Sequence, residues 1–361
     1  SMITIFRALQ GMFAAFTVPL ARLTIVKLFS HDYVHAMIII APFNLIGAML
    51  GPLIGGMVTT WLNWRFIFFL NVPIGILAII LIRYCFPTLT SSLKYKFDYR
   101  GFLLIGLGLA LALFAIDTVI DTELHTSLKI IVFLLSLGLF ISYYFYAKHK
   151  QHSIINIKLF KKPVFNYLIA TSVSFRVFTI GLTFLIPLYL QTQFKYSALQ
   201  AGLVMVTFIT GALLSRFFVR KMFKIFAYRI LLVSMLLIVS LSEFVISYLL
   251  SHFHLIPLLL MLLIIGYAMP VLMSMLNSKI YTNLDPNMIN DGTTINSAAI
   301  QLSGSFSVAI IALILIIISG QYMLDWQQVL PKSSYSIVML ISGFFMLLTC
   351  AAVPFSPKEI K

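Results

Sequence analysis

Nearly unbroken apolar runs recur along this chain of 361 residues. Residues 130–145 and 308–319 are two examples, and neither alternates between apolar and polar side chains. A helix needs about 20 apolar residues to cross the hydrocarbon of a bilayer, whereas transmembrane barrel strands alternate with a period of two. Since helices also satisfy their own backbone hydrogen bonds in lipid, the runs predict membrane-spanning helices and exclude an outer-membrane barrel.

Eleven such spans fit along the sequence, with short connections between them. They lie at residues 3–22, 34–57, 65–86, 101–119, 127–147, 164–190, 198–219, 229–250, 255–277, 292–318 and 336–355. Only 10% of the residues are charged, against about 25% in soluble domains. The predicted fold class is therefore all-α, a polytopic membrane protein with about 11 transmembrane helices, and a single-pass protein with a large soluble domain is excluded.

The basic residues predict the orientation of these spans. The net charge is +15, and 19 Lys and Arg residues lie in alternate loops on one side, against four in the loops of the other side. Cytoplasmic loops are enriched in Lys and Arg, so the richer side is expected to be cytoplasmic, with the C-terminus inside. Topology explains the positive charge, and no nucleic-acid partner is expected.

The most distinctive motif is GAMLGPLIGG at residues 47–56, in the second span. Gly47, Gly51 and Gly55 share one helix face, on which a neighbouring backbone can approach closely, and Gly56 lies beside it. Pro52 lacks an N–H and is expected to kink the helix. The motif favours a packing face with a role in transport, and an ordinary close helix crossing is the alternative.

A few charged and polar residues lie inside the spans. Arg7 is in the first span with Gln10 one turn further on, and an intramembrane arginine usually faces a partner or a water-filled cavity. The alternative for Arg7 is that it snorkels to the outer headgroups. Arg176 and Glu243 are the only charges deep in the last six spans. They are candidates either for an ion pair across the bundle or for a proton or substrate site.

Several kinds of chemistry have no counterpart in the sequence. It contains no phosphate-binding Gly-Lys-Ser/Thr loop, no catalytic cluster and no metal-ligand spacing. Neither an enzyme nor a cofactor is therefore expected, and a transporter of this kind would draw its energy from an ion gradient.

Three motifs together resemble those of the major facilitator drug:proton antiporters. RALQG at 7–11 is similar to R-x-x-Q-G of their fourth helix, and 47–56 to G-x-x-x-G-P-x-x-G-G of their fifth. WRFIFFLNVPIG at 64–75 resembles W-R-x-I-F-x-x-N-V-P-x-G of the fourteen-helix branch, the EmrB/QacA type. Phe97, Asp98 and Gly101 at the start of the fourth span agree with that branch. The short outer loop before the last span and Arg176 look most like the MdtD-like efflux proteins.

The resemblance implies the major facilitator fold and a division of the chain. The eleven spans would be helices four to fourteen, so the first three helices of the family are not in this sequence. The implied parts are the remainder of the N-terminal helix bundle (1–86), an interpolated helix pair (87–147), a basic cytoplasmic linker (148–163) and a C-terminal six-helix bundle (164–361).

The resemblance also implies a function, proton-coupled efflux of amphipathic small molecules or drugs by alternating access across a bacterial cytoplasmic (inner) membrane. Arg7, with Glu243, is the candidate for proton coupling, and the Gly47–Gly56 face would seal bundle against bundle, with the seventh span (Gly202, Gly211, Ala212) as its partner. The candidates for the substrate cavity are Gln10, Asn44, Arg176, Tyr189 and Asn296. The expected partners are a small-molecule substrate and the bilayer, with no cofactor besides the proton gradient, and accessory efflux partners are left open.

Two alternatives stand beside this interpretation. One is a narrow-specificity exporter of a metabolite or metal chelate, for which Arg176 would suit an anionic ligand. The other is a truncated, non-transporting remnant or membrane scaffold, suggested by the missing helices.

Overall fold

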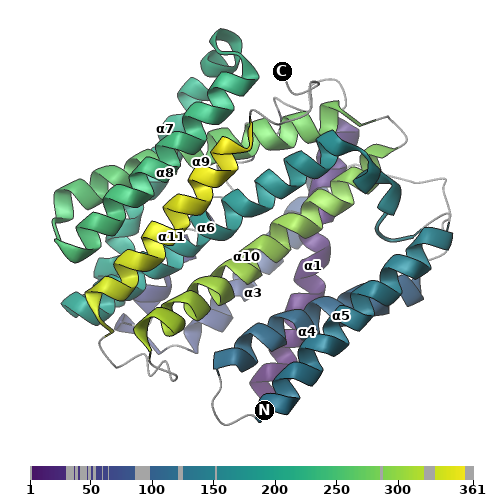
Figure 1. Cartoon of the computed structure of the whole chain (residues 1–361), viewed down its shortest axis with the longest axis horizontal. Helices are drawn as coiled ribbons and strands as arrows, with labels where there is room; N and C mark the ends of the chain where they lie inside the picture. The colour runs from purple at the N-terminus through teal and green to yellow at the C-terminus, as the bar shows by residue number, and fades with distance from the viewer. Residues whose placement is uncertain are drawn as a thin grey trace.

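The computed structural model describes most of the chain outside the second span. The described residues are 2–29, 36, 40, 47, 50–51, 54–58, 60–63, 65–85, 98–120, 125–150, 153–284, 288–320 and 330–353. Within these ranges all regular secondary structure is helical, as the all-α prediction requires (Figure 1).

The helices follow one another with short connections. They are α1 (Met2–Leu28), α3 (Phe66–Cys85), α4 (Tyr99–Ile120), α5 (Thr126–His149), α6 (Pro163–Phe194), α7 (Ala198–Ile225), α8 (Tyr228–Ser251), α9 (Leu255–Thr282), α10 (Ile289–Ser319) and α11 (Lys332–Ala351), with a short 3-10 helix η1 (Ile157–Lys161) before α6.

Nine helices in the described part of the chain, α3 to α11, are long and apolar enough to cross a membrane. They coincide with nine of the predicted spans, and α1 coincides with the first. The second predicted span, 34–57, lies mostly outside the described residues, although each residue of it that is described is helical. The prediction of a polytopic helical membrane protein is therefore confirmed.

Local sequence signals define the connection between α6 and α7. Lys195 ends α6 in the left-handed conformation, with φ of 55°. Ser197 then caps α7, because its hydroxyl accepts a hydrogen bond from the Gln200 N–H while the Gln200 side chain accepts one from the Ser197 N–H. This reciprocal capping satisfies two N–H groups at the helix start and gives a short turn between two adjacent helices.

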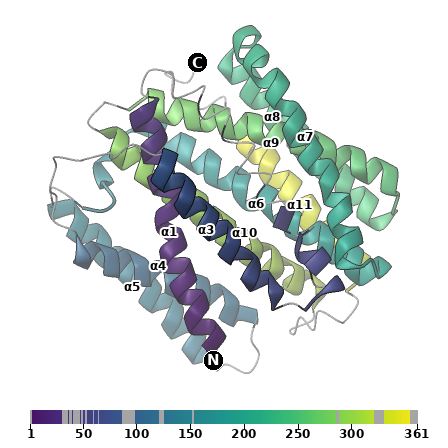
Figure 2. The same cartoon turned by 180° about the vertical axis from the view of Figure 1, so that it is seen from behind.

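The helices α6 to α11 pack into one bundle (Figures 1 and 2). Within it α8 lies between α9 and α11, α7 packs on α9, and α6 packs on α10 and α11. A close crossing joins α7 and α9: a Cβ added to Gly211 would overlap the Leu263 carbonyl, and one added to Gly266 would overlap the Phe208 carbonyl. Small residues of this kind let two membrane helices approach at backbone distance.

The pair α4 and α5 lies beside this bundle, with α4 against α10 (Figure 1). Ser136 Oγ of α5 donates to the Gly108 carbonyl of α4 at 2.9 Å. The segment after α5 is also anchored: Tyr143 Oη bonds both the N–H (2.8 Å) and the carbonyl (3.2 Å) of Ile155. Asn156 Nδ2 donates to Asp291 Oδ2 in the first turn of α10 at 2.8 Å. The linker is thus tied to both α5 and α10.

Candidate functional site

The glycine-rich motif meets the last six helices at its final residue. Gly56 is buried, and a Cβ there would come within 2.8 Å of backbone atoms of Ala198 and Leu199, in the first turn of α7. A side chain at this position would therefore push the second span away from α7.

The other glycines of the motif do not show a close contact of this kind. At Gly47, Gly51 and Gly55 an added Cβ would meet no other described atom within 4 Å, and Pro52 lies outside the described residues. The expectation that Gly211 faces the second span is wrong, because Gly211 lies against α9. Contact between the motif and α7 is seen at Gly56 and the start of that helix.

The candidates on the N-terminal side are only partly described. Arg7 and Gln10 are one turn apart on α1, and α1 packs against α10 (Figure 2). Gln10 is exposed, whereas the side chain of Arg7 and the whole of Asn44 lie outside the described residues.

Arg176 lies near the middle of α6, and its side chain is only 1% exposed. Its Nη1 donates to Ser172 Oγ, one turn earlier on the same helix, at 2.7 Å. Asn296, on the neighbouring α10, is also fully buried and donates from Nδ2 to Asn277 Oδ1 of α9 at 3.0 Å. The structure therefore places a cation and a carboxamide inside the bundle, on two helices that pack together.

Glu243 lies in the seam between α8 and α11. It is fully buried, and its Oε2 accepts a hydrogen bond from Ser342 Oγ at 2.8 Å. Within the described part of the chain, its Oε1 has no hydrogen-bond partner. Further hydrogen bonds cross the seam, among them those from Ser240 Oγ to the Gly343 carbonyl at 2.8 Å, from Ser247 Oγ to the Ser336 carbonyl at 2.7 Å and from Ser336 Oγ to the Ser247 carbonyl at 2.7 Å.

The ion pair considered for Arg176 and Glu243 is not what the structure shows. Among the described residues the ion pair is Lys150 with Asp98, while Arg176 bonds Ser172 and Glu243 bonds Ser342. The physical reason is helix arrangement: Glu243 is turned toward α11, whereas Arg176 bonds within its own helix α6.

Tyr189, a predicted cavity residue, is packed in an aromatic cluster near the end of α6. It is fully buried, and its hydroxyl donates to the Leu250 carbonyl of α8 at 2.6 Å. Its ring lies edge-on to Tyr335 and Phe194, with centroids 5.2 and 5.6 Å away. The hydroxyl thus ties α6 to the end of α8.

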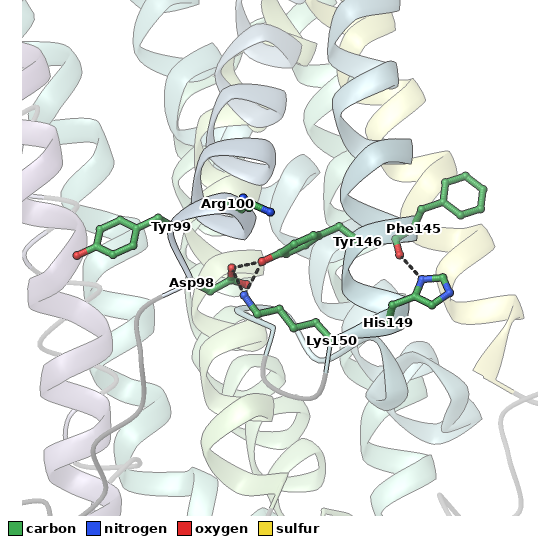
Figure 3. Close-up of a pocket in the computed structure, with 7 residues that line it drawn as sticks. All are labelled: Asp98, Tyr99, Arg100, Phe145, Tyr146, His149 and Lys150. Atoms are coloured by element: carbon green, nitrogen blue, oxygen red, sulfur yellow. Dashed lines mark hydrogen bonds and ion pairs between the residues drawn. The ribbon is translucent and has the colours of Figure 1, made fainter.

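A charged cluster at the paired ends of α4 and α5 was not among the predicted sites (Figure 3). Asp98 Oδ1 accepts hydrogen bonds from the Gly101 N–H at 3.1 Å, Tyr146 Oη at 2.6 Å and Lys150 Nζ at 2.6 Å. A pocket of about 650 Å³ lies here, lined also by Tyr99, Arg100, Phe145 and His149. Asp is a preferred residue at the position just before a helix begins, and α4 begins at Tyr99, so the cap at Asp98 could have been predicted from the sequence.

The Asp98 cluster keeps both of its charged members ionised. Burial alone would raise the pKa of Asp98, but hydrogen bonds from Lys150, Tyr146 and the Gly101 N–H outweigh burial and hold that pKa below its ordinary value. The hydrogen bond to Asp98 is the main cause that raises the pKa of Lys150 above its ordinary value. At neutral pH the two side chains therefore form a clamp between the start of α4 and the end of α5.

No group of three or more His, Cys, Asp or Glu side chains that could hold a metal ion occurs in the ranges that the structure describes.

A chain of long apolar helices, packed in a bundle with buried polar side chains, defines a multi-pass membrane protein. Residues 1–308 match the family model of the Major Facilitator Superfamily. The chain belongs to this superfamily, which places it among membrane transporters rather than enzymes.

The curated relatives that the chain matches include proteins named for multidrug resistance, MdtD. The one of Escherichia coli O6:H1 is 31% identical over 321 residues, which cover 88% of this chain and 67% of the relative. The one of Shigella boydii serotype 4 is 30% identical over the same shares of both chains. The resemblance to major facilitator drug:proton antiporters is thereby confirmed, and the chain spans about two thirds of the length of these relatives.

Proposed function

We propose that the chain acts in proton-coupled efflux of amphipathic small molecules by alternating access. The names of its relatives support drug efflux, and the RALQG and glycine-rich motifs support the antiporter type. In this proposal the proton gradient supplies the energy, and no cofactor takes part.

The observation that carries the proposal is the contact of Gly56 with the first turn of α7. Alternating access requires two helix bundles that close against each other at one face and separate there in the opposite state. Gly56 would belong to the N-terminal part (1–86), and Ala198 to the C-terminal bundle (164–361). A backbone contact without side chains gives two such bundles a surface that can close tightly and still part.

The buried polar residues supply candidate roles within this scheme. Arg7 would take part in proton exchange, and Glu243 is the second candidate because its buried carboxylate has one oxygen without a described partner. Gln10, Asn44, Arg176, Tyr189 and Asn296 would contribute to substrate binding. Intramembrane ionisable residues are costly and mark ion or substrate pathways, which favours a functional role for Arg176 and Glu243 over a purely architectural one.

The proposed location is a bacterial cytoplasmic (inner) membrane with the C-terminus inside. The Lys- and Arg-rich loops support this orientation. It would place the Asp98–Lys150 clamp and the linker (148–163) at the cytoplasmic face, and the paired helices 87–147 beside the bundle.

Dye accumulation in a pump-deficient bacterium tests the proposal. Cells that produce the chain are expected to accumulate less ethidium than cells that produce Gly56→Leu at equal membrane levels. Gly75→Leu is the matched control, because a Cβ at Gly75 on α3 meets no described atom within 4 Å. Equal accumulation with the chain, with Gly56→Leu and with an empty vector would favour the non-transporting remnant instead.

Arg176 favours a second candidate function, export of an anionic metabolite. A guanidinium that is 1% exposed inside the bundle can hold a carboxylate or phosphate by charge-assisted hydrogen bonds. Purified protein that binds organic anions, with binding lost in Arg176→Gln and kept in Arg176→Lys, would support this candidate over the drug exporter.

A further inference from the structure

The C-terminal end of α7 continues beyond the apolar part of that helix. α7 has 28 residues and is therefore about 42 Å long, whereas the hydrocarbon of a bilayer is about 30 Å thick. Its apolar segment ends at Val219, and residues 220–225 extend the helix by about another 9 Å. The last turns of α7 are thus expected to lie at the level of the lipid headgroups, on the cytoplasmic side in the proposed orientation.

The chain around this helix end is basic and holds no acidic residue. The basic residues between positions 216 and 229 are Arg216, Arg220, Lys221, Lys224 and Arg229. No Asp or Glu occurs from residue 124 to residue 242. Lys221 and Lys224 are exposed, and neither takes part in an ion pair within the ranges that the structure describes. Their charges are therefore available to an anion.

The inner face of the helix end is held against the bundle. Met222 and Phe223 are half-buried and pack on the hydrophobic core. Tyr267 Oη of α9 donates a hydrogen bond to Met222 Sδ at 3.2 Å, and the ring of Tyr267 also lies 6.5 Å from that of Phe218. These contacts fix which face of α7 is turned inward at this level and which is left uncovered.

The uncovered face changes from apolar to basic along the helix. Leu213, Phe217 and Lys221 follow one another at intervals of four residues, and Lys224 comes three residues later, so all four share one face. All are exposed, and the side chain of Phe217 is 76% exposed. Since α7 lies at the edge of the bundle (Figures 1 and 2), this face is turned toward lipid, with its apolar part in the hydrocarbon and its two lysines at the headgroups.

We infer that this face of α7 binds an anionic phospholipid, with the lipid phosphate at Lys221 and Lys224 and an acyl chain along Phe217 and Leu213. Basic clusters beside a membrane helix attract anionic lipids, and this cluster has no acid of its own to compete. The exposed ring one turn before Lys221 favours a lipid over a soluble phosphate, because an acyl chain covers that ring and an ion does not. The inference does not depend on transport activity.

Photolabelling of the purified chain in phosphatidylcholine nanodiscs tests this site. The probe is a phosphatidylglycerol that carries a diazirine near the carboxyl end of one acyl chain, and labelled peptides are identified by mass spectrometry. Saturable labelling is expected on residues 213–226, and unlabelled phosphatidylglycerol is expected to compete for it. Equal competition by added phosphatidylcholine, or labelling of this segment that does not saturate, would overturn the inference.

Variants of equal charge separate this site from a general attraction to anionic lipid. Lys221→Gln with Lys224→Gln should raise the mole fraction of probe needed for half-maximal labelling, by about fivefold for each lysine removed. Lys221→Arg with Lys224→Arg should keep labelling. Arg83→Gln with Lys148→Gln is the matched control, because it removes two charges from exposed positions at the ends of α3 and α5.

The control variant should label residues 213–226 like the unchanged protein. All these positions are exposed, so the unfolding temperatures are expected to agree, and a shared temperature shows that a loss of labelling is not a loss of fold. Unchanged labelling without the two lysines of α7, or an equal loss in the control, would contradict the site as described.

Discussion

Lys150 Nζ lies 2.6 Å from Asp98 Oδ1 and thereby joins the end of α5 to the start of α4. The carboxylate also caps α4, because it accepts a hydrogen bond from the Gly101 N–H. The side chain of Asp98 therefore stabilises the start of α4 and holds the end of α5 against it. A Cβ at Gly101 would overlap that carboxylate, which is why a glycine at this position suits the clamp.

The Asp98 clamp predicts a pH dependence of stability. The folded-state pKa of Asp98 is lowered, so its contribution is present above the unfolded pKa of about 3.9 and is lost as the pH falls through the folded value. The pKa of Lys150 is raised, so its contribution is present below about 10.4 and is lost as the pH rises through the folded value. Thermal unfolding of purified protein should therefore show a plateau at intermediate pH.

Asp98→Ala is expected to lower stability by about 1 kcal/mol on that plateau, the usual cost of losing a helix cap. Its unfolding temperature should also vary less at acid pH than that of the unchanged protein. An unchanged unfolding temperature and acid profile in Asp98→Ala would contradict the clamp.

The crossing of α7 and α9 predicts opposite effects for two glycine substitutions. Gly211→Ala is expected to destabilise by about 1–3 kcal/mol, because the added methyl overlaps the Leu263 carbonyl. Gly138→Ala on α5 meets no described atom within 4 Å and should be neutral or stabilising by about 0.5–1 kcal/mol, the usual gain from alanine in a helix. Thermal unfolding in one detergent compares the two, and destabilisation of equal size in both would contradict the crossing.

The seam between α8 and α11 predicts a separation of folding from transport. Ser342→Ala leaves the carboxylate of Glu243 without its described donor and is expected to cost about 1–3 kcal/mol of stability. Glu243→Gln keeps an oxygen that accepts from Ser342 but cannot release a proton. Under the proposed coupling role, Glu243→Gln should keep its unfolding temperature and lose efflux, whereas Ser342→Ala should lose stability and keep efflux.

The linker predicts a difference between two neighbouring tyrosines. Tyr143→Phe removes both hydrogen bonds to Ile155 and should expose the linker to proteolysis, because local opening follows the loss of local contacts. Trypsin cleavage in the linker is expected to speed up by about fivefold, the effect of about 1 kcal/mol. Tyr144→Phe, at an exposed position, is the control, and equal cleavage rates in both variants would contradict the anchoring role.

The sequence predicted the bounds of the helices closely, but it did not predict which helices pack against one another. The span predicted at 229–250 is the helix Tyr228–Ser251, because lipid demands a continuous apolar segment whose ends hydropathy marks. Hydropathy gives the depth of Glu243 but not the direction of its side chain, and its partner Ser342 is 99 residues away. For the same reason the sequence did not predict that Gly211 faces α9. A small residue at a given depth in the membrane can pack against any of several helices, and hydropathy does not say which one.

The helix caps, by contrast, depend on residues that are close in the sequence and can be predicted from it. The capping pair Ser197 and Gln200 and the cap at Asp98 are set by residues three positions apart. Tyr146 and Lys150 are four apart on α5, which puts them on one face, but their common target 48 to 52 residues earlier follows only from the packing of α4 on α5.

Proton-driven transport by purified protein tests the central proposal most directly. The chain is reconstituted in liposomes, and a pH gradient is imposed with the acidic side in the lumen. Uptake of ethidium into the vesicles is then followed. Uptake is expected to require the gradient, to disappear in Gly56→Leu and to persist in Gly75→Leu. Ethidium movement that equals that of protein-free liposomes with the gradient present would contradict proton-coupled transport by this chain.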